Sequence, residues 1–259
     1  MVNIHNSTNS PATGMSQAHQ SVGRSMERLA SGSRLNSARD NAAGMAISQL
    51  FLADVATAQQ SSRNIADGIS MVQTADGAAG AIGDNLIRMN QLAAQASNGT
   101  LSDQQKTLIQ QEFDDLSAEN VRISEATTFN GISLLESGHT VDIALGDGST
   151  LGIETGVTAS VSGDLVEDAA SAQSNVETAI NQLSALRGGL GTAINRLERA
   201  GDVTATKTES LMAAVSRISD TDIAQETATM TANLVLIQIT IALSAQANNS
   251  AQHSLQLLN

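Results

Sequence analysis

Four histidines, a glycine-rich segment and an Asp-Gly pair offer the side chains from which catalytic or metal-binding motifs are built. The histidines are scattered, and no two have the spacing of a metal-binding pair: His5, His19, His139 and His253. The segment Arg187–Gly191 lacks the Lys-Ser or Lys-Thr that follows the glycines of a phosphate loop. Asp147-Gly148 lacks the alternating carboxylates and closing glutamate of a calcium loop, and the chain contains no cysteine. The residues therefore predict a protein that is not an enzyme and has no metal or cofactor.

With catalytic and metal-binding motifs excluded, the strongest feature of the sequence is apolar surface that must be buried. Seven aliphatic side chains lie between Leu234 and Leu243, and four consecutive positions already cover about 300° of a helix. A helix that is apolar on all sides must be buried on all sides, so partners have to surround it. A narrower apolar stripe near the N-terminus offers one such partner. We therefore expect self-assembly through Val22, Met26, Leu29, Leu234, Val235, Leu236, Ile237, Ile241 and Leu243.

Charge and hydropathy exclude several classes of partner. Thirteen basic and 26 acidic side chains give a net charge of −13, which disfavours binding to nucleic acid or an anionic membrane. One basic cluster has no interleaved aromatic residue, which favours a solvated or self-pairing helix face over a nucleic-acid site: Arg24, Arg28, Arg34 and Arg39. Leu234–Leu243 is shorter than the roughly 20 residues that a membrane span needs, so no membrane insertion is expected. Because residues 1–11 do not resemble a secretory signal, the chain is expected to be soluble or to be exported without signal cleavage.

Hydrophobic spacing predicts long helices that pack side by side. A three-and-four spacing of apolar residues is the seam of a coiled coil or helical bundle. It occurs at Ile65, Ile69, Val72, Ala75, Ala79, Ile82, Leu86, Met89 and Ala93, and again at Leu183, Leu186, Leu190, Ile194 and Leu197. A helix over about 41–96 would extend roughly 80 Å. Between about 138 and 163 the hydrophobic period changes to two, which predicts a β-hairpin.

Local signals place the ends of these helices. Ser37 with Asp40 resembles a capping box that opens the long helix, and Ser102 with Gln105 resembles one that opens the next. The helical pattern that returns after the hairpin continues to the C-terminus, with a weak point around Gly201.

The predicted fold is mainly α: a long antiparallel coiled-coil helical bundle, or rod, with a small central β-hairpin region. Residues 1–40 and 220–259 are expected to form a terminal domain of paired helices. Residues 41–219 are expected to form a helical rod domain that contains the hairpin at about 138–163.

Several motifs closely resemble those of bacterial flagellins and occur in the same order. They are Glu27–Gly44, Ser62–Ile69, Gln73–Ala78, Thr128–Gly131, Arg217–Ala224 and Ala245–Asn248. The resemblance spans roughly residues 20–135 and 175–259. The short segment between these regions indicates a form that lacks the variable outer domains of the family.

The resemblance implies a structural subunit of the extracellular flagellar filament that serves motility, with the two chain ends paired around the central channel. It also implies export through the flagellar type III apparatus. The implied partners are further copies of the chain, an export chaperone, and the hook-junction and cap proteins. An animal Toll-like receptor is a further implied partner, through Arg88, Leu92 and Glu112. Two alternatives remain: a hook–filament junction protein of the same axial structure, or a soluble coiled-coil interaction module.

Overall fold

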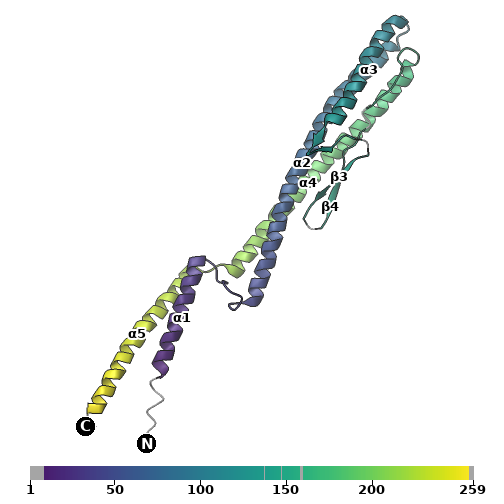
Figure 1. The fold of residues 1–259 in the computed structure, drawn as a ribbon. Coiled ribbons are helices and arrows are strands. Elements are labelled where there is room, and N and C mark those ends of the chain that lie inside the picture. The colour runs from purple at the N-terminus through teal and green to yellow at the C-terminus, as the bar shows by residue number, and fades with distance from the viewer. Residues whose placement is uncertain (1–8, 137, 147, 158–159, 257–259) are drawn as a thin grey trace. The chain divides into compact units, whose positions relative to one another are not determined.

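The computed structural model describes residues 9–136, 138–146, 148–157 and 160–256 (Figure 1). Within these residues the helices are α1 (Asn9–Ser31), α2 (Ala42–Ala96), α3 (Asp103–Ala126), α4 (Ala169–Ser219) and α5 (Ile223–Gln256). Two antiparallel strand pairs lie between α3 and α4 in the chain: β1 (Thr128–Phe129) with β2 (Ile132–Ser133), and β3 (Thr140–Ala144) with β4 (Thr150–Glu154). This mainly α-helical fold with a small central β region confirms the predicted fold class.

The chain divides into two compact units. The terminal unit comprises Met1–Val55 and Ser210–Asn259, and the central unit comprises Ala56–Glu209. The division falls inside α2 and α4, whereas the domain boundaries expected from the sequence, at 40/41 and 219/220, coincide with breaks between helices. The two descriptions differ because the compact units follow spatial proximity along the chain, whereas the sequence pattern marks the ends of helices.

The core of the central unit follows the predicted seam of α2. Of the nine predicted positions eight are buried, and Ile69 is half-buried against the same core. Ala75 is fully buried, while the side chain of its neighbour Asp76 is 39% exposed. The small alanine therefore takes the core position at the one place where strict spacing meets a charged residue.

Contacts between α2 and α4 show that the two helices run in opposite directions along this core. Arg187 Nε lies 2.8 Å from Asp76 Oδ1. Seven residues later on α2, Gly83 lies beside Leu183, four residues earlier on α4. The predicted α4 seam is largely confirmed: Leu183, Leu190 and Leu197 are buried, Leu186 and Ile194 are half-buried at its edge, and Ala193 is buried in place of Ile194.

α2 starts at a cap that the sequence pattern missed. The side-chain oxygen of Asn41 accepts a 2.9 Å hydrogen bond from the backbone N–H of Gly44, which satisfies a free N–H of the first turn. The capping role predicted for Ser37 and Asp40 is wrong. Asp40 instead accepts hydrogen bonds from the backbone N–H and the hydroxyl of Ser37, within the turn that precedes the helix.

The other helix ends agree with the sequence at α3 but not at α4. Ser102 and Gln105 form the predicted reciprocal capping box of α3. The helical pattern was expected to continue to the C-terminus, but α4 passes through the weak point at Gly201 and ends at Ser219. The break lies just beyond, where Asp222 caps α5 through its side-chain oxygen.

β3 and β4 form the predicted hairpin of the central unit. The apolar residues that alternate along the two strands pack against the core: Val141, Ile143, Leu151 and Ile153. The chain after β3 approaches α2 closely, because Ser61 donates its hydroxyl hydrogen bond to the backbone oxygen of Leu145. Gly146 has a φ of +79°, and a Cβ there would lie 2.6 Å from Ser61 Cβ. Asp147, part of the Asp-Gly turn noted in the sequence, lies outside the described residues.

In the terminal unit, the segments that follow α1 and α4 pair with each other through backbone hydrogen bonds. Gly32 ends α1 with a φ of +68°, a backbone conformation that favours glycine. Ser33 and Asp220 form an antiparallel bridge, and the N–H of Thr221 donates a 3.0 Å hydrogen bond to the oxygen of Gly32. This backbone pairing joins the end of α1 to the start of α5.

Candidate self-assembly site

α1 and α5 lie side by side in the terminal unit (Figure 1). Ala18 and Val22, one helical turn apart on α1, pack against Ile237 of α5, with Met230 at the edge of the cluster. The three buried side chains are only 7–8% exposed. Among the described side chains, a narrow apolar cluster joins the two helices.

One polar contact is built into this helix pair. The hydroxyl of Ser25 donates a 2.6 Å hydrogen bond to one carboxylate oxygen of Glu226. Arg28 Nη1 lies 3.7 Å from the other oxygen. The side chain of Glu226 is only 14% exposed, so these two partners compensate a charge that is largely removed from water.

The sequence analysis missed this contact, although two local signals pointed to it. Ser25 interrupts the apolar stripe of α1 between Val22 and Leu29, where a polar residue needs a partner if it is buried. Glu226 lies in the first turn of α5, where the helix dipole favours a carboxylate. Neither signal identifies the other residue as its partner, because they lie on different helices.

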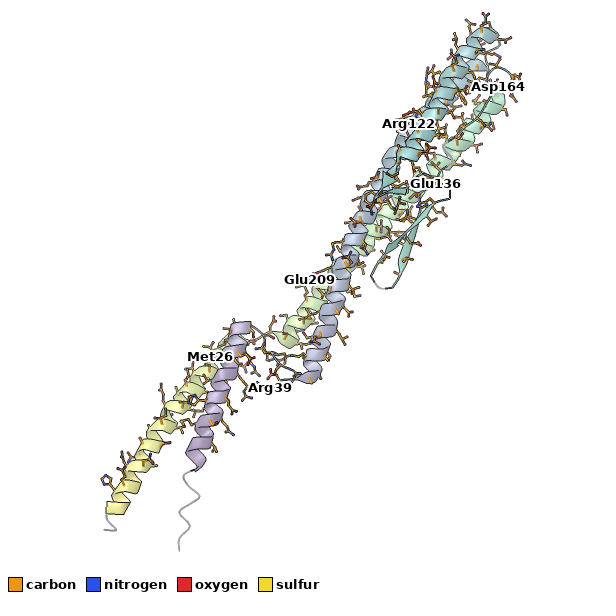
Figure 2. All side chains as sticks on the ribbon, viewed as in Figure 1. Met26, Arg39, Arg122, Glu136, Asp164 and Glu209 are labelled. Atoms are coloured by element: carbon orange, nitrogen blue, oxygen red, sulfur yellow. The ribbon has the colours of Figure 1, made fainter. Side chains whose placement is uncertain are left out.

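Most of the predicted assembly residues are not covered within the subunit. Val22 and Ile237 meet in the buried cluster, and Leu29 is half-buried. The others are largely exposed: Met26 57%, Leu234 39%, Val235 47%, Leu236 52%, Ile241 54% and Leu243 60%. α1 thus covers one side of α5 and leaves a long apolar surface facing outward. Figure 2 labels Met26, the exposed member of the α1 stripe.

α5 is apolar over a longer stretch than the sequence pattern indicated. An 18-residue window within Ile223–Ser250 has a mean hydropathy of 1.6, so this segment is, by length and composition alone, sufficient to cross a membrane. The ten-residue estimate was too short because alanine and methionine residues extend the apolar composition beyond Leu234–Leu243. One such helix is weak support for a membrane span, since a helix buried between protein subunits has the same composition.

The three residues implied in receptor recognition lie in two environments of the central unit. Arg88 of α2 and Glu112 of α3 form an ion pair with an N–O distance of 2.6 Å, and their side chains are 49% and 47% exposed. Leu92, one turn after Arg88, is 1% exposed and belongs to the core. The structure therefore brings Arg88 and Glu112 together at the surface and separates Leu92 from it.

A cavity of about 1050 Å³ lies in the central unit, between α3 and the segment that leads into α4. Gln110 and Ser117 donate hydrogen bonds to the backbone oxygens of residues 163 and 161, and Asn175 donates one to that of residue 162. Gln110 also donates to the side chain of Asp114. The bonds to the backbone hold the connecting segment in place. Within the described part of the chain, no three His, Asp or Glu side chains gather as a metal site.

Comparisons with known proteins agree with one another. The family model described as the bacterial flagellin N-terminal helical region matches residues 2–140, and that of the C-terminal helical region matches residues 173–258. The chain is 38% identical to a flagellin of Halalkalibacterium halodurans, over 93% of this chain and 96% of that protein. It is 34% identical to a flagellin of Bacillus subtilis, over 91% and 92% of the two chains. It is also similar to the crystal structure of Bacillus cereus flagellin, with 29% identity and a TM-score of 0.51, over 54% of this chain and 88% of that one.

Proposed function

The chain belongs to the bacterial flagellin family, whose members are structural subunits of the flagellar filament, and we propose that it assembles through the uncovered surface of the α1–α5 pair. Membership of the family makes it an extracellular protein that self-assembles into a homopolymer, with motility as the implied role. The observation that supports the proposed site is the apolar side of α5 that no described residue of the same subunit covers.

Burial of this surface contributes favourable free energy to association. Fully burying a large aliphatic side chain contributes about 1.5–3 kcal/mol. Because these α5 side chains are roughly half-exposed, completing their burial would contribute about 1 kcal/mol each. Five or six of them, repeated in every subunit, offset a substantial part of the cost of association.

The same argument supports a division of roles along the chain. We place residues 1–40 and 220–259 in the filament core, where the apolar surface of α5 is enclosed by other subunits and not by lipid. Residues 41–219 would then form the surrounding rod. The charge of the chain supports burial between subunits, since −13 disfavours an anionic membrane surface.

Leu236→Asp tests this site. Leu236 is 52% exposed in the subunit, so the substitution should leave the monomer folded. In a filament the same carboxylate would be enclosed without a partner, at a cost of several kcal/mol in every subunit. We expect no filaments by sedimentation and electron microscopy at concentrations where the parent chain assembles, with an unchanged circular dichroism spectrum of the monomer.

Leu236→Met is the matched control, because it keeps an apolar side chain of similar volume and should form filaments as the parent does. Normal filaments from Leu236→Asp would refute the proposed assembly surface. A loss of helical signal in the Leu236→Asp monomer would also contradict it, since that result would assign Leu236 to the fold of the subunit.

Other partners are proposed from the family resemblance: an export chaperone and the hook-junction and cap proteins. An unassembled subunit that exposes the apolar side of α5 needs protection from aggregation, which supports a chaperone. We also propose export without signal cleavage, supported by the polar composition of residues 1–11. The intact mass of the secreted chain tests this, because cleavage would shorten it.

Recognition by a Toll-like receptor is proposed for the exposed Arg88–Glu112 pair alone. Their joint exposure on α2 and α3 supports the proposal, whereas Leu92 would contribute by supporting α2 from the core. Arg88→Ala with Glu112→Ala should abolish activation of receptor-expressing reporter cells by monomer. Activation equal to that by the parent chain would contradict a role for this pair.

A further inference from the structure

The four clustered arginines of the terminal unit divide into two pairs with different roles. Arg28 lies within ion-pair distance of Glu226, and Arg34 donates a 2.7 Å hydrogen bond to the backbone oxygen of Ile218. Arg24 and Arg39 form no ion pair with any carboxylate in the described part of the chain. Arg28 and Arg34 therefore contact groups of the same subunit, whereas Arg24 and Arg39 have no ion-pair partner among the described residues.

Arg24 and Arg39 face one cavity of about 540 Å³ in the terminal unit, which we call the arginine notch. It is lined by Gln20, Gly23, Arg24, Glu27, Arg39 and Asp40. Arg24 comes from α1 and Arg39, labelled in Figure 2, from the segment between α1 and α2. Both arginines are exposed at the surface of the subunit.

The two carboxylates in the notch do not neutralise these arginines by direct contact. Asp40 accepts two hydrogen bonds from Ser37, both at its Oδ2, and Glu27 forms no ion pair within the described residues. Among the described residues, the Arg24 side chain makes one hydrogen bond, of 3.4 Å, to the hydroxyl of Ser21. Most of the guanidinium donors therefore remain unused, in a planar geometry that suits a carboxylate.

The acidic charge that would complement the notch is concentrated in the central unit. That unit carries 20 acidic and eight basic side chains, a net charge of −12, whereas the terminal unit has six acidic and five basic. Ion pairs in the described part of the central unit engage only three of its carboxylates: Asp76, Glu112 and Glu119. A homopolymer of such chains brings many like charges close together, so an attractive contact is needed to offset them.

We propose that the arginine notch is a docking point for carboxylates on the central unit of a second copy of this chain in the filament. The proposal rests on the proposed function, since the filament supplies the neighbouring copy. The complementary charges would orient subunits as they join and add an attraction that weakens with salt.

The test compares filament assembly by full-length variants at about 50 and 300 mM NaCl, which changes the range of electrostatic attraction roughly twofold. Arg24→Gln with Arg39→Gln removes both positive charges. We expect its critical concentration for assembly to rise about tenfold at low salt and to lose much of its salt dependence. Arg24→Lys with Arg39→Lys keeps the charge and should remain within about threefold of the parent chain.

Arg196→Gln with Arg199→Gln is the matched control. Both arginines are exposed on α4 without an ion pair in the described residues, and the variant has the same net charge as the notch variant. It should assemble with the salt dependence of the parent. An equal loss of assembly in this control would assign the effect to net charge and contradict the notch.

Two further outcomes would overturn the proposal. One is assembly of the glutamine notch variant at the critical concentration and salt dependence of the parent. The other is a loss of helical circular dichroism in its monomer, which would assign the arginines to the fold of the subunit. A failure of this proposal can be distinguished from a failure of the proposed α5 surface. The notch variants are compared with filaments of the parent chain, whereas the α5 surface is tested separately by Leu236→Asp.

Discussion

Ser25 of α1 and Glu226 of α5 lie 201 positions apart in the sequence and share a 2.6 Å hydrogen bond. The carboxylate of Glu226 is only 14% exposed, so Ser25 and Arg28 replace interactions that water would otherwise supply. Apolar packing alone permits the two helices to slide along one another, whereas this contact is satisfied in one alignment. We infer that Ser25 and Glu226 hold the register of the helix pair together with the backbone hydrogen bond from Thr221 to Gly32.

Glu226→Ala should weaken the pairing of α1 with α5 by about 1–3 kcal/mol, because a hydrogen bond to a charged group is lost and Arg28 is left without its partner. Hydrogen exchange measures this in the monomer: amides of α1 near Ser25 should exchange about tenfold faster. Glu209→Ala, at an exposed position on α4 without an ion pair in the described residues, is the control and should leave them unchanged. Unaltered exchange in Glu226→Ala would show that the contact does not hold the pair.

Leu190 and Arg187 lie one turn apart on α4 and should differ strongly in their effect on stability. Leu190 is fully buried, and Leu190→Ala should cost about 2–5 kcal/mol through lost burial and the cavity that remains. Arg187 pairs with Asp76 at the surface, where both side chains are more than a third exposed, so Arg187→Ala should cost about 1 kcal/mol or less. Thermal unfolding of the two variant monomers measures the difference, and equal costs would contradict the assignment of Leu190 to the core.

Alanine substitutions at Gly146 and Gly148 distinguish the cost of backbone strain from the cost of a steric clash. Both have a positive φ, of +79° and +88°, so alanine at either position carries a similar conformational cost of about 1 kcal/mol. Only at Gly146 would the new Cβ meet Ser61 of α2, at 2.6 Å, whereas Gly148 has open space. Gly146→Ala should therefore lower the midpoint of thermal unfolding more than Gly148→Ala. Equal shifts would mean that the hairpin moves away from α2 without cost.

The turn before α2 should respond to pH through Asp40. Hydrogen bonding from the Ser37 side chain, with smaller contributions from the Ser37 backbone and the Arg28 charge, lowers the pKa of Asp40 below its usual range near about 4. Because the pKa of Asp40 is lower in the folded state, its carboxylate stabilises the turn at pH values above the pKa that Asp40 has in the unfolded chain. That stabilisation is lost as the pH falls through the folded pKa.

Nuclear magnetic resonance can follow this titration directly. The amide signal of Ser37 should change below about pH 4, because protonated Asp40 is a weaker acceptor. Asp40→Asn should remove the change. A midpoint at or above the usual aspartate value would show that the Ser37 hydrogen bonds do not favour the ionised form in solution.

Local patterns in the sequence determined the secondary structure and the faces that become core. The seam from Val72 to Ala93 depends only on the helical repeat, and the hairpin from Thr140 to Glu154 depends only on alternation along a strand. The capping box of Ser102 and Gln105 joins residues three positions apart. All of these interactions act between near neighbours in the chain, so composition and spacing are sufficient to specify them. The family motifs, which identify a filament subunit, are likewise continuous segments.

Only the tertiary structure decided which of these surfaces meet. Periodicity shows that α1 and α5 are apolar, but the partnership of Ser25 with Glu226 depends on how two helices from opposite ends of the chain align. The same limit explains why Leu92 was taken as a contact residue although it is buried, and why the division of the four arginines into used and unused pairs was not foreseen. A periodic pattern specifies which face of a helix avoids water, whereas the element that covers that face depends on the packing of residues distant in sequence.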